Sequence, residues 1–123
     1  MLVQTNTYQV PLDKREQHLR LMRKFQQCLR RLGCDGFTVQ EQTASNFAPS
    51  VGSTSRFVQT MRFRDRRHYE AVQEAERQDR IAQDLIREFC ELIDFTAQRE
   101  QGSFSVDYYN VVVEPTGGDS GVE

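Results

Sequence analysis

The hydrophobic pattern is clearest over residues 13–32, where apolar side chains recur at spacings of three and four. This spacing places them on one face of an amphipathic helix, and the opposite face is basic. Asp13 precedes Glu16 by three positions, which is typical of a capping box, and Gly33 stands where a left-handed C-cap is favoured. The predicted apolar face comprises Leu19, Met22, Phe25, Leu29 and Leu32.

A second helical pattern begins after Asp65, a favourable N-cap, and continues to about residue 93. Its stripe is interrupted at residues 76–80, where the sequence E-R-Q-D-R contains no apolar residue and Asp79 occupies a position that suits a hydrophobic one. We therefore expect a kink here, or a division into two helices. The stripe comprises Tyr69, Val72, Ala75, Ala82, Ile86, Phe89 and Ile93.

Four segments have the alternation or the apolar content of β-strands. They cover residues 2–10, 37–43, 56–63 and 103–114. In the third segment the odd-numbered positions from Phe57 to Phe63 form an apolar face. The fourth segment is apolar at both parities between Tyr108 and Val113, which is typical of a strand covered on both sides.

The predicted order is strand, helix, strand, strand, helix, strand, which favours an α+β fold of the ferredoxin-like βαββαβ type. Two helices cover one face of a four-stranded antiparallel sheet and leave the other face bare. A second copy of the chain is the simplest cover for that face, so we expect a homodimer that packs through its open sheet faces. We also expect the two helices to run in the same direction, with their N-termini at one end. The domain is predicted over residues 1–114, followed by a flexible, acidic, Gly-rich tail at 115–123.

Composition narrows the class of protein. The chain has 123 residues, with 16 Lys and Arg against 18 Asp and Glu, and its net charge of −2 predicts one small soluble domain. The three cysteines, Cys28, Cys34 and Cys90, form no C-x-x-C pair, so we expect free thiols and no metal. No apolar run approaches the roughly 18 residues of a membrane span, and the N-terminus does not resemble a signal peptide. We therefore expect a cytoplasmic protein with no membrane association and no nucleic-acid partner.

Three local features are similar to one known superfamily. They are a first strand that leads through a proline into D-K-R-E, the turn L-G-C-D-G-F-T-V before the second strand, and R-F-V-Q-T-M-R-F-R-D-R-R-H-Y-E-A-V at the third strand. Together with the order of the elements, over residues 2–114, they resemble the dimeric α+β-barrel superfamily. This group includes antibiotic-biosynthesis-type monooxygenases and stress-response barrel proteins.

The resemblance implies a cavity between sheet and helices, used in some members to oxidise aromatic compounds with dioxygen and no bound cofactor. In haem-degrading members an Asn of the first strand lies at the site, and Asn6 occupies a similar place. Those members also use a Trp and a His on the second helix. This chain has no Trp, and His68 falls in the first turn of that helix, so haem degradation is not expected.

Several residues are candidates for chemistry in such a cavity. Asn6 shares the inward parity of its strand and is a candidate to orient a ligand. His18 and His68 are candidate proton acceptors near neutral pH, and Glu41 is a candidate buried acid. The alternative for each is a structural side chain: a satisfied amide, a half-exposed helix residue, or a solvated strand end. The cavity is predicted to be lined by Asn6, Tyr8, Phe57, Met61, Phe89 and Tyr108 and to open toward the helix N-termini.

Three functions stay open from sequence. The first is a small-molecule enzyme resembling cofactor-independent monooxygenases, acting on an aromatic or polyketide-like compound. The second is a homodimer that binds a ligand without catalysis or has a stress-associated role. The third is an interaction module that docks through its oppositely charged helices.

Overall fold

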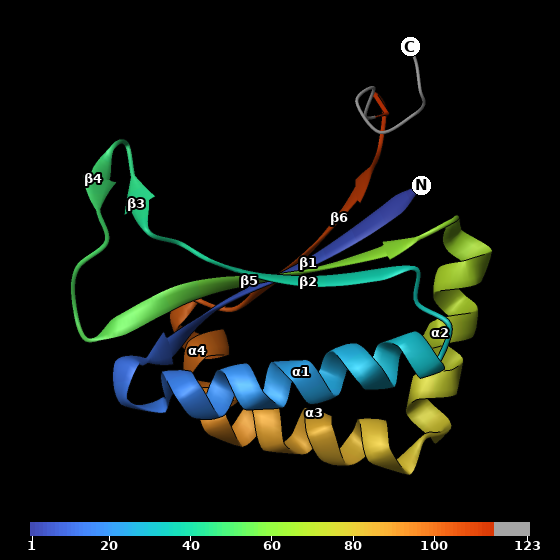
Figure 1. Cartoon of the computed structure of the whole chain (residues 1–123), viewed down its shortest axis with the longest axis horizontal. Coiled ribbons are helices and arrows are strands. Elements are labelled where there is room, and N and C mark those ends of the chain that lie inside the picture. The colour runs from blue at the N-terminus through green and yellow to red at the C-terminus, as the bar shows by residue number, and fades with distance from the viewer. Residues whose placement is uncertain (115–123) are drawn as a thin grey trace.

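The computed structural model describes residues 1–114, and the predicted tail at 115–123 lies outside the described residues. Four strands form an antiparallel sheet in the order β2-β5-β1-β6, and helices α1, α3 and α4 lie on one side of it (Figure 1). This is the ferredoxin-like α+β fold that the sequence predicted. In chain order the elements are β1 (Leu2–Pro11), a short 3₁₀ helix (Leu12–Lys14), α1 (Arg15–Arg31), β2 (Gly36–Glu41), β3 (Ala44–Ser45), β4 (Ala48–Pro49), β5 (Thr54–Phe63), α2 (Arg66–Gln78), α3 (Arg80–Ile93), α4 (Phe95–Gln101) and β6 (Ser105–Asn110).

Strand alternation separates the core from the open face of the sheet. In β5 the odd-numbered residues 55–63 are buried against the helices, as the sequence predicted. The register pairs Tyr8 with Phe57 and Gln4 with Met61, so the even-numbered residues of β1 face the same side. The core of the domain is therefore a single layer between the sheet and the helices.

Helix α1 ends as predicted and begins differently. Gly33 has a φ of 98°, which confirms the left-handed position after the helix. The capping box is wrong, because Asp13 lies in the 3₁₀ helix and the side chain of Lys14, the residue before α1, makes no capping hydrogen bond. Pro11 starts that 3₁₀ helix with a φ of −57°, which moves the start of α1 to Arg15.

The second helical segment divides at Asp79, in agreement with the interrupted stripe. The side chain of Asp65 accepts a hydrogen bond from the His68 backbone N–H and caps α2. The side chain of Asp79 accepts from the Ala82 N–H at 2.9 Å and caps α3. It also receives two hydrogen bonds from Arg31 of α1, at 2.9 and 2.8 Å, which fix the corner between α2 and α3.

The helices α1 and α3 run antiparallel, and the expectation of a common direction is wrong (Figure 1). The reason is the sheet itself: β1 and β5 are antiparallel neighbours, and each helical segment that follows one of them runs back along it. The N-termini of α1 and α3 therefore lie at opposite ends of the domain. Contrary to the prediction from the sequence, the positive N-terminal ends of α1 and α3 are not together at one mouth of the cavity.

The predicted fourth strand is shorter and more exposed than its sequence indicated. β6 covers only residues 105–110 at the edge of the sheet, paired with β1 alone, and all six residues are exposed. The helix α4 and the small β3–β4 hairpin were not predicted. In Figure 1 this hairpin rises on the open side of the sheet. No helix within residues 1–114 is long and apolar enough to cross a membrane.

Candidate functional site

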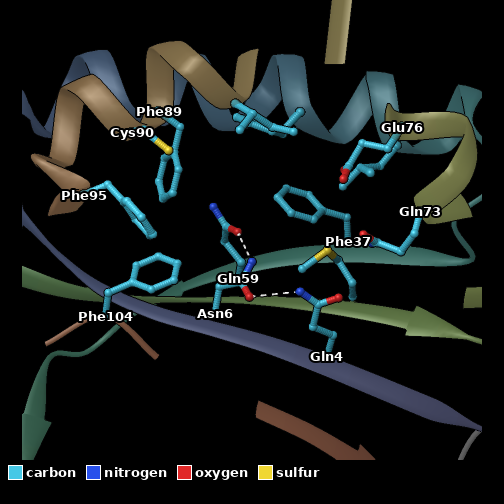
Figure 2. Close-up of a pocket in the computed structure, with 14 residues that line it drawn as sticks. Gln4, Asn6, Phe37, Gln59, Gln73, Glu76, Phe89, Cys90, Phe95 and Phe104 are labelled. Atoms are coloured by element: carbon cyan, nitrogen blue, oxygen red, sulfur yellow. Dashed lines mark hydrogen bonds between the residues drawn. The ribbon is translucent and has the colours of Figure 1, made fainter. Parts of the chain in front are cut away.

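A cavity of about 280 Å³ lies between the sheet and the helices. This volume is just below the range for small-molecule sites, which begins at about 300 Å³. Figure 2 shows Phe89, Cys90, Phe95 and Phe104 at one end and Gln73 and Glu76 of α2 at the other. The aromatic wall is formed by Phe25, Phe37, Phe89, Phe95 and Phe104.

The floor of the cavity is a row of three amide side chains on the two central strands. Gln4 Nε2 donates to Asn6 Oδ1 at 3.1 Å, and Asn6 Nδ2 donates to Gln59 Oε1 at 2.9 Å (Figure 2). Asn6 and Gln59 are partners in the register of β1 and β5, which places their side chains next to each other. The floor can therefore hydrogen-bond a ligand inside an otherwise apolar space.

The row continues into the core behind the cavity. Gln59 Nε2 donates to the Tyr8 hydroxyl at 3.2 Å, and that hydroxyl lies 2.6 Å from Nε2 of His18. Burial raises the pKa of the Tyr8 hydroxyl and lowers the pKa of the His18 imidazole to about 4. Both side chains are neutral near pH 7, and their hydrogen bond is a structural one within the core.

Glu76 is the titratable group at the α2 end of the cavity. Burial raises the pKa of its carboxyl, and the nearby Arg77 lowers it by less. Its carboxylate has no hydrogen-bond or ion-pair partner among residues 1–114. A carboxylate in a mostly apolar space is a stronger proton acceptor than one in water, so Glu76 can act as a general base.

The structure distributes the predicted lining residues over two places. Asn6, Met61 and Phe89 line the cavity. Tyr8 and Phe57 do not: they are 0% and 1% exposed and pack with His18 in the core behind the floor. Inward parity placed them correctly on the helix side of the sheet, but neighbouring side chains fill the space above them.

The two histidines lie outside the cavity. His18 is 0% exposed and bonded to Tyr8. The imidazole of His68 bridges two backbone groups: Nδ1 accepts the Arg64 N–H at 3.0 Å, and Nε2 lies 2.7 Å from the Gly33 carbonyl. With both nitrogens used, His68 joins the start of α2 to the end of α1.

Glu41 and Tyr108 also lie away from the cavity. Glu41 pairs with Arg15 at 2.8 Å and accepts from the Ser55 hydroxyl at 2.6 Å, and these hydrogen bonds lower the pKa of its carboxyl. Tyr108 is half exposed on the edge strand, with its hydroxyl 2.9 Å from that of Tyr69 on α2. Each is held by a partner of its own.

Sequence reasoning missed four polar residues of the cavity: Gln4, Gln59, Gln73 and Glu76. A usable signal existed for most of them. Gln4 and Gln59 share the inward parity of Asn6 and Met61, and Glu76 follows Val72 by four residues on the apolar stripe of α2. The signal for a cavity was the presence of polar residues on an inward face. At Glu76 it was obscured, because the apolar stripe is interrupted at residues 76–80. Within residues 1–114 no group of three or more His, Cys, Asp or Glu side chains is arranged to hold a metal ion.

Two solved structures resemble this one over almost the whole chain. One is a proposed antibiotic biosynthesis monooxygenase from Deinococcus radiodurans, with a TM-score of 0.56 and 12% identity over 95% of this chain and 100% of the other. The second is a NIPSNAP family protein from Agrobacterium tumefaciens, with a TM-score of 0.52 and 16% identity over 96% and 88%. The chain shares the ferredoxin-like α+β fold of these two structures. No family model matches the sequence, and no curated protein matches it either.

Proposed function

We propose that the protein binds a small aromatic compound in this cavity and oxidises it with dioxygen, as a monooxygenase that needs no bound cofactor. The observation that carries the proposal is the combination of aromatic walls, an amide floor and an unpaired carboxylate, Glu76, in one cavity. The fold shared with the Deinococcus radiodurans protein supports the same choice.

Each part of the site has a separate task in this reaction. The aromatic wall holds the ring system, and Asn6 hydrogen-bonds a polar group of the substrate. Glu76 removes a proton from a ring methylene group that is made acidic by a neighbouring carbonyl. The resulting carbanion reduces dioxygen, so that CH₂ and O₂ become C=O and H₂O. The substrate supplies all four electrons.

The test is a comparison of Glu76→Gln with Glu74→Gln, an exposed acid on the same helix. Oxygen uptake is measured with anthrone and with single-ring analogues that carry the same activated methylene. We expect Glu76→Gln to lower the rate by about 10²- to 10⁴-fold, because a general base is lost, while Glu74→Gln retains it. Equal rates in the two variants would show that Glu76 is not the base.

A second candidate is ligand binding without catalysis. It is favoured by the positions of His18 and His68, because both imidazoles are held by partners outside the cavity. Among the described residues, Glu76 is the one carboxylate that lines the cavity. In this case the wild-type protein binds the aromatic probes and takes up no oxygen. Oxygen uptake by the wild type that depends on Glu76 excludes this candidate.

We also propose that a second copy of the chain covers the open face of the sheet. This support comes from half-buried β-branched side chains on that face: Thr5 and Thr7 of β1, and Val58 and Thr60 of β5. Such a surface suits sheet-to-sheet packing. A cytoplasmic location remains a prediction from the sequence.

A further inference from the structure

The hydrogen bonds of the cavity floor all point in one direction. The amide nitrogen of Gln4 donates to Asn6, that of Asn6 donates to Gln59, and that of Gln59 donates to the Tyr8 hydroxyl. The Tyr8 proton is then free for Nε2 of His18. Each amide therefore donates to the next group toward the core, and the oxygens of Asn6 and Gln59 accept from the residue before them in the row.

This direction is fixed at its inner end by Met22. Gln59 Nε2 lies 3.3 Å from the Met22 sulfur as well as 3.2 Å from the Tyr8 oxygen. A thioether sulfur is an acceptor and never a donor, so the nitrogen of Gln59, and not its oxygen, belongs at this position. Reversing the row would place two acceptors, the Gln59 oxygen and the Met22 sulfur, against each other.

The outer end of the row is an unpaired carbonyl oxygen. Gln4 is 9% exposed, and its Oε1 is buried with no hydrogen-bond partner among the described residues. Figure 2 shows this oxygen on the side of Gln4 that faces away from Asn6. Gln4 lines the cavity, its Oε1 is buried beside it, and a buried acceptor without a partner is unfavourable until a donor reaches it.

We propose that Gln4 determines the specificity of the cavity, with Oε1 accepting a hydrogen bond from a hydroxyl or amino group on the aromatic ligand. This rests on the proposed function, since it requires an aromatic compound to enter the cavity. It selects phenols and aromatic amines over compounds of the same shape that lack a donor. The remaining amide row holds the Gln4 oxygen in the orientation that the ligand needs.

The experiment compares hydroxynaphthalene with methylnaphthalene, two probes of nearly equal size of which only the first carries a donor. Their Kd values are measured by calorimetry for the wild type, Gln4→Met, Gln4→Leu and Gln27→Met, the last an exposed control. We expect the ratio of the two Kd values to shift about tenfold toward methylnaphthalene in Gln4→Met, the equivalent of one hydrogen bond. Gln4→Leu also lacks the acceptor and is expected to give the same shift, whereas Gln27→Met retains the wild-type ratio.

The outcomes separate this inference from the function on which it rests. If both probes bind and Gln4→Met has the wild-type ratio, the inference is wrong and the cavity still binds aromatic compounds. If neither probe binds the wild type, the proposed function fails and the inference fails with it. Thermal melts identify a Gln4 variant that does not fold, and the other Gln4 variant then decides: a wild-type ratio in it overturns the inference.

Discussion

At the scale of single residues, polar side chains on the inner face of the sheet do two different things. Gln4, Asn6 and Gln59 face an open space, whereas Tyr8 and His18 are enclosed by aromatic rings. The alternation of side chains along β1 predicts that Asn6 points inward, because this alternation is a local property of the strand backbone. Whether an inward side chain meets a cavity or a neighbour depends on residues far away in sequence.

His18 makes stability depend on pH. Its pKa is about 4 in the folded protein because of burial, against about 6.5 in the unfolded chain. Between these values the unfolded state binds the additional proton, so the free energy of unfolding falls as the pH decreases. We expect this residue to lower the free energy of unfolding by about 2 kcal/mol between pH 7 and pH 5.

Urea unfolding at the two pH values checks this expectation, with His18→Phe as the comparison. The variant lacks the titrating group and loses this part of the pH dependence, whatever its stability at pH 7. The same slope in both proteins would mean that another group is responsible.

At the scale of elements, the ends of the helices were predicted with mixed success. Asp65 caps the start of α2 and Gly33 follows the end of α1, both as predicted, because a cap depends on a few neighbouring residues. Asp13 also has the residue type of a cap but lies in the 3₁₀ helix that Pro11 begins. The division at Asp79 followed from its sequence, whereas its two hydrogen bonds with Arg31 join segments that are distant in the chain.

The cap of α2 provides a test at this scale. Asp65→Ala removes the acceptor of the His68 N–H, so we expect a loss of about 1 kcal/mol in the free energy of unfolding. Asp65→Asn retains an oxygen acceptor and most of the stability. Chemical unfolding of the three proteins measures both effects, and equal losses in the two variants would contradict a capping role.

At the scale of the whole molecule, the main feature is the sheet face that the helices α1, α3 and α4 do not cover. Val58 lies near the middle of this face, opposite Thr7 on β1 and Gln40 on β2. If two copies pack face to face, Val58→Asp places a charge in the interface. We expect this variant to be a monomer in sedimentation analysis while the wild type is a dimer.

The matched control is Ile81→Asp, which adds the same charge at an exposed position on α3, away from the open face. It is expected to remain a dimer. A wild-type monomer, or a dimer that tolerates Asp at position 58, would rule out sheet-to-sheet packing.

The sequence by itself determined the order of the main strands and helices, the ferredoxin-like fold and the inward side of Asn6. These follow from short-range periodicity, which the backbone geometry of helices and strands imposes directly. Only the tertiary structure decided that α1 and α3 are antiparallel, that Tyr8 and His18 form a hydrogen bond in the core, and that Glu76 reaches the same cavity as Gln4. Those outcomes depend on how distant segments pack, and the space left between packed side chains is not encoded in any local pattern.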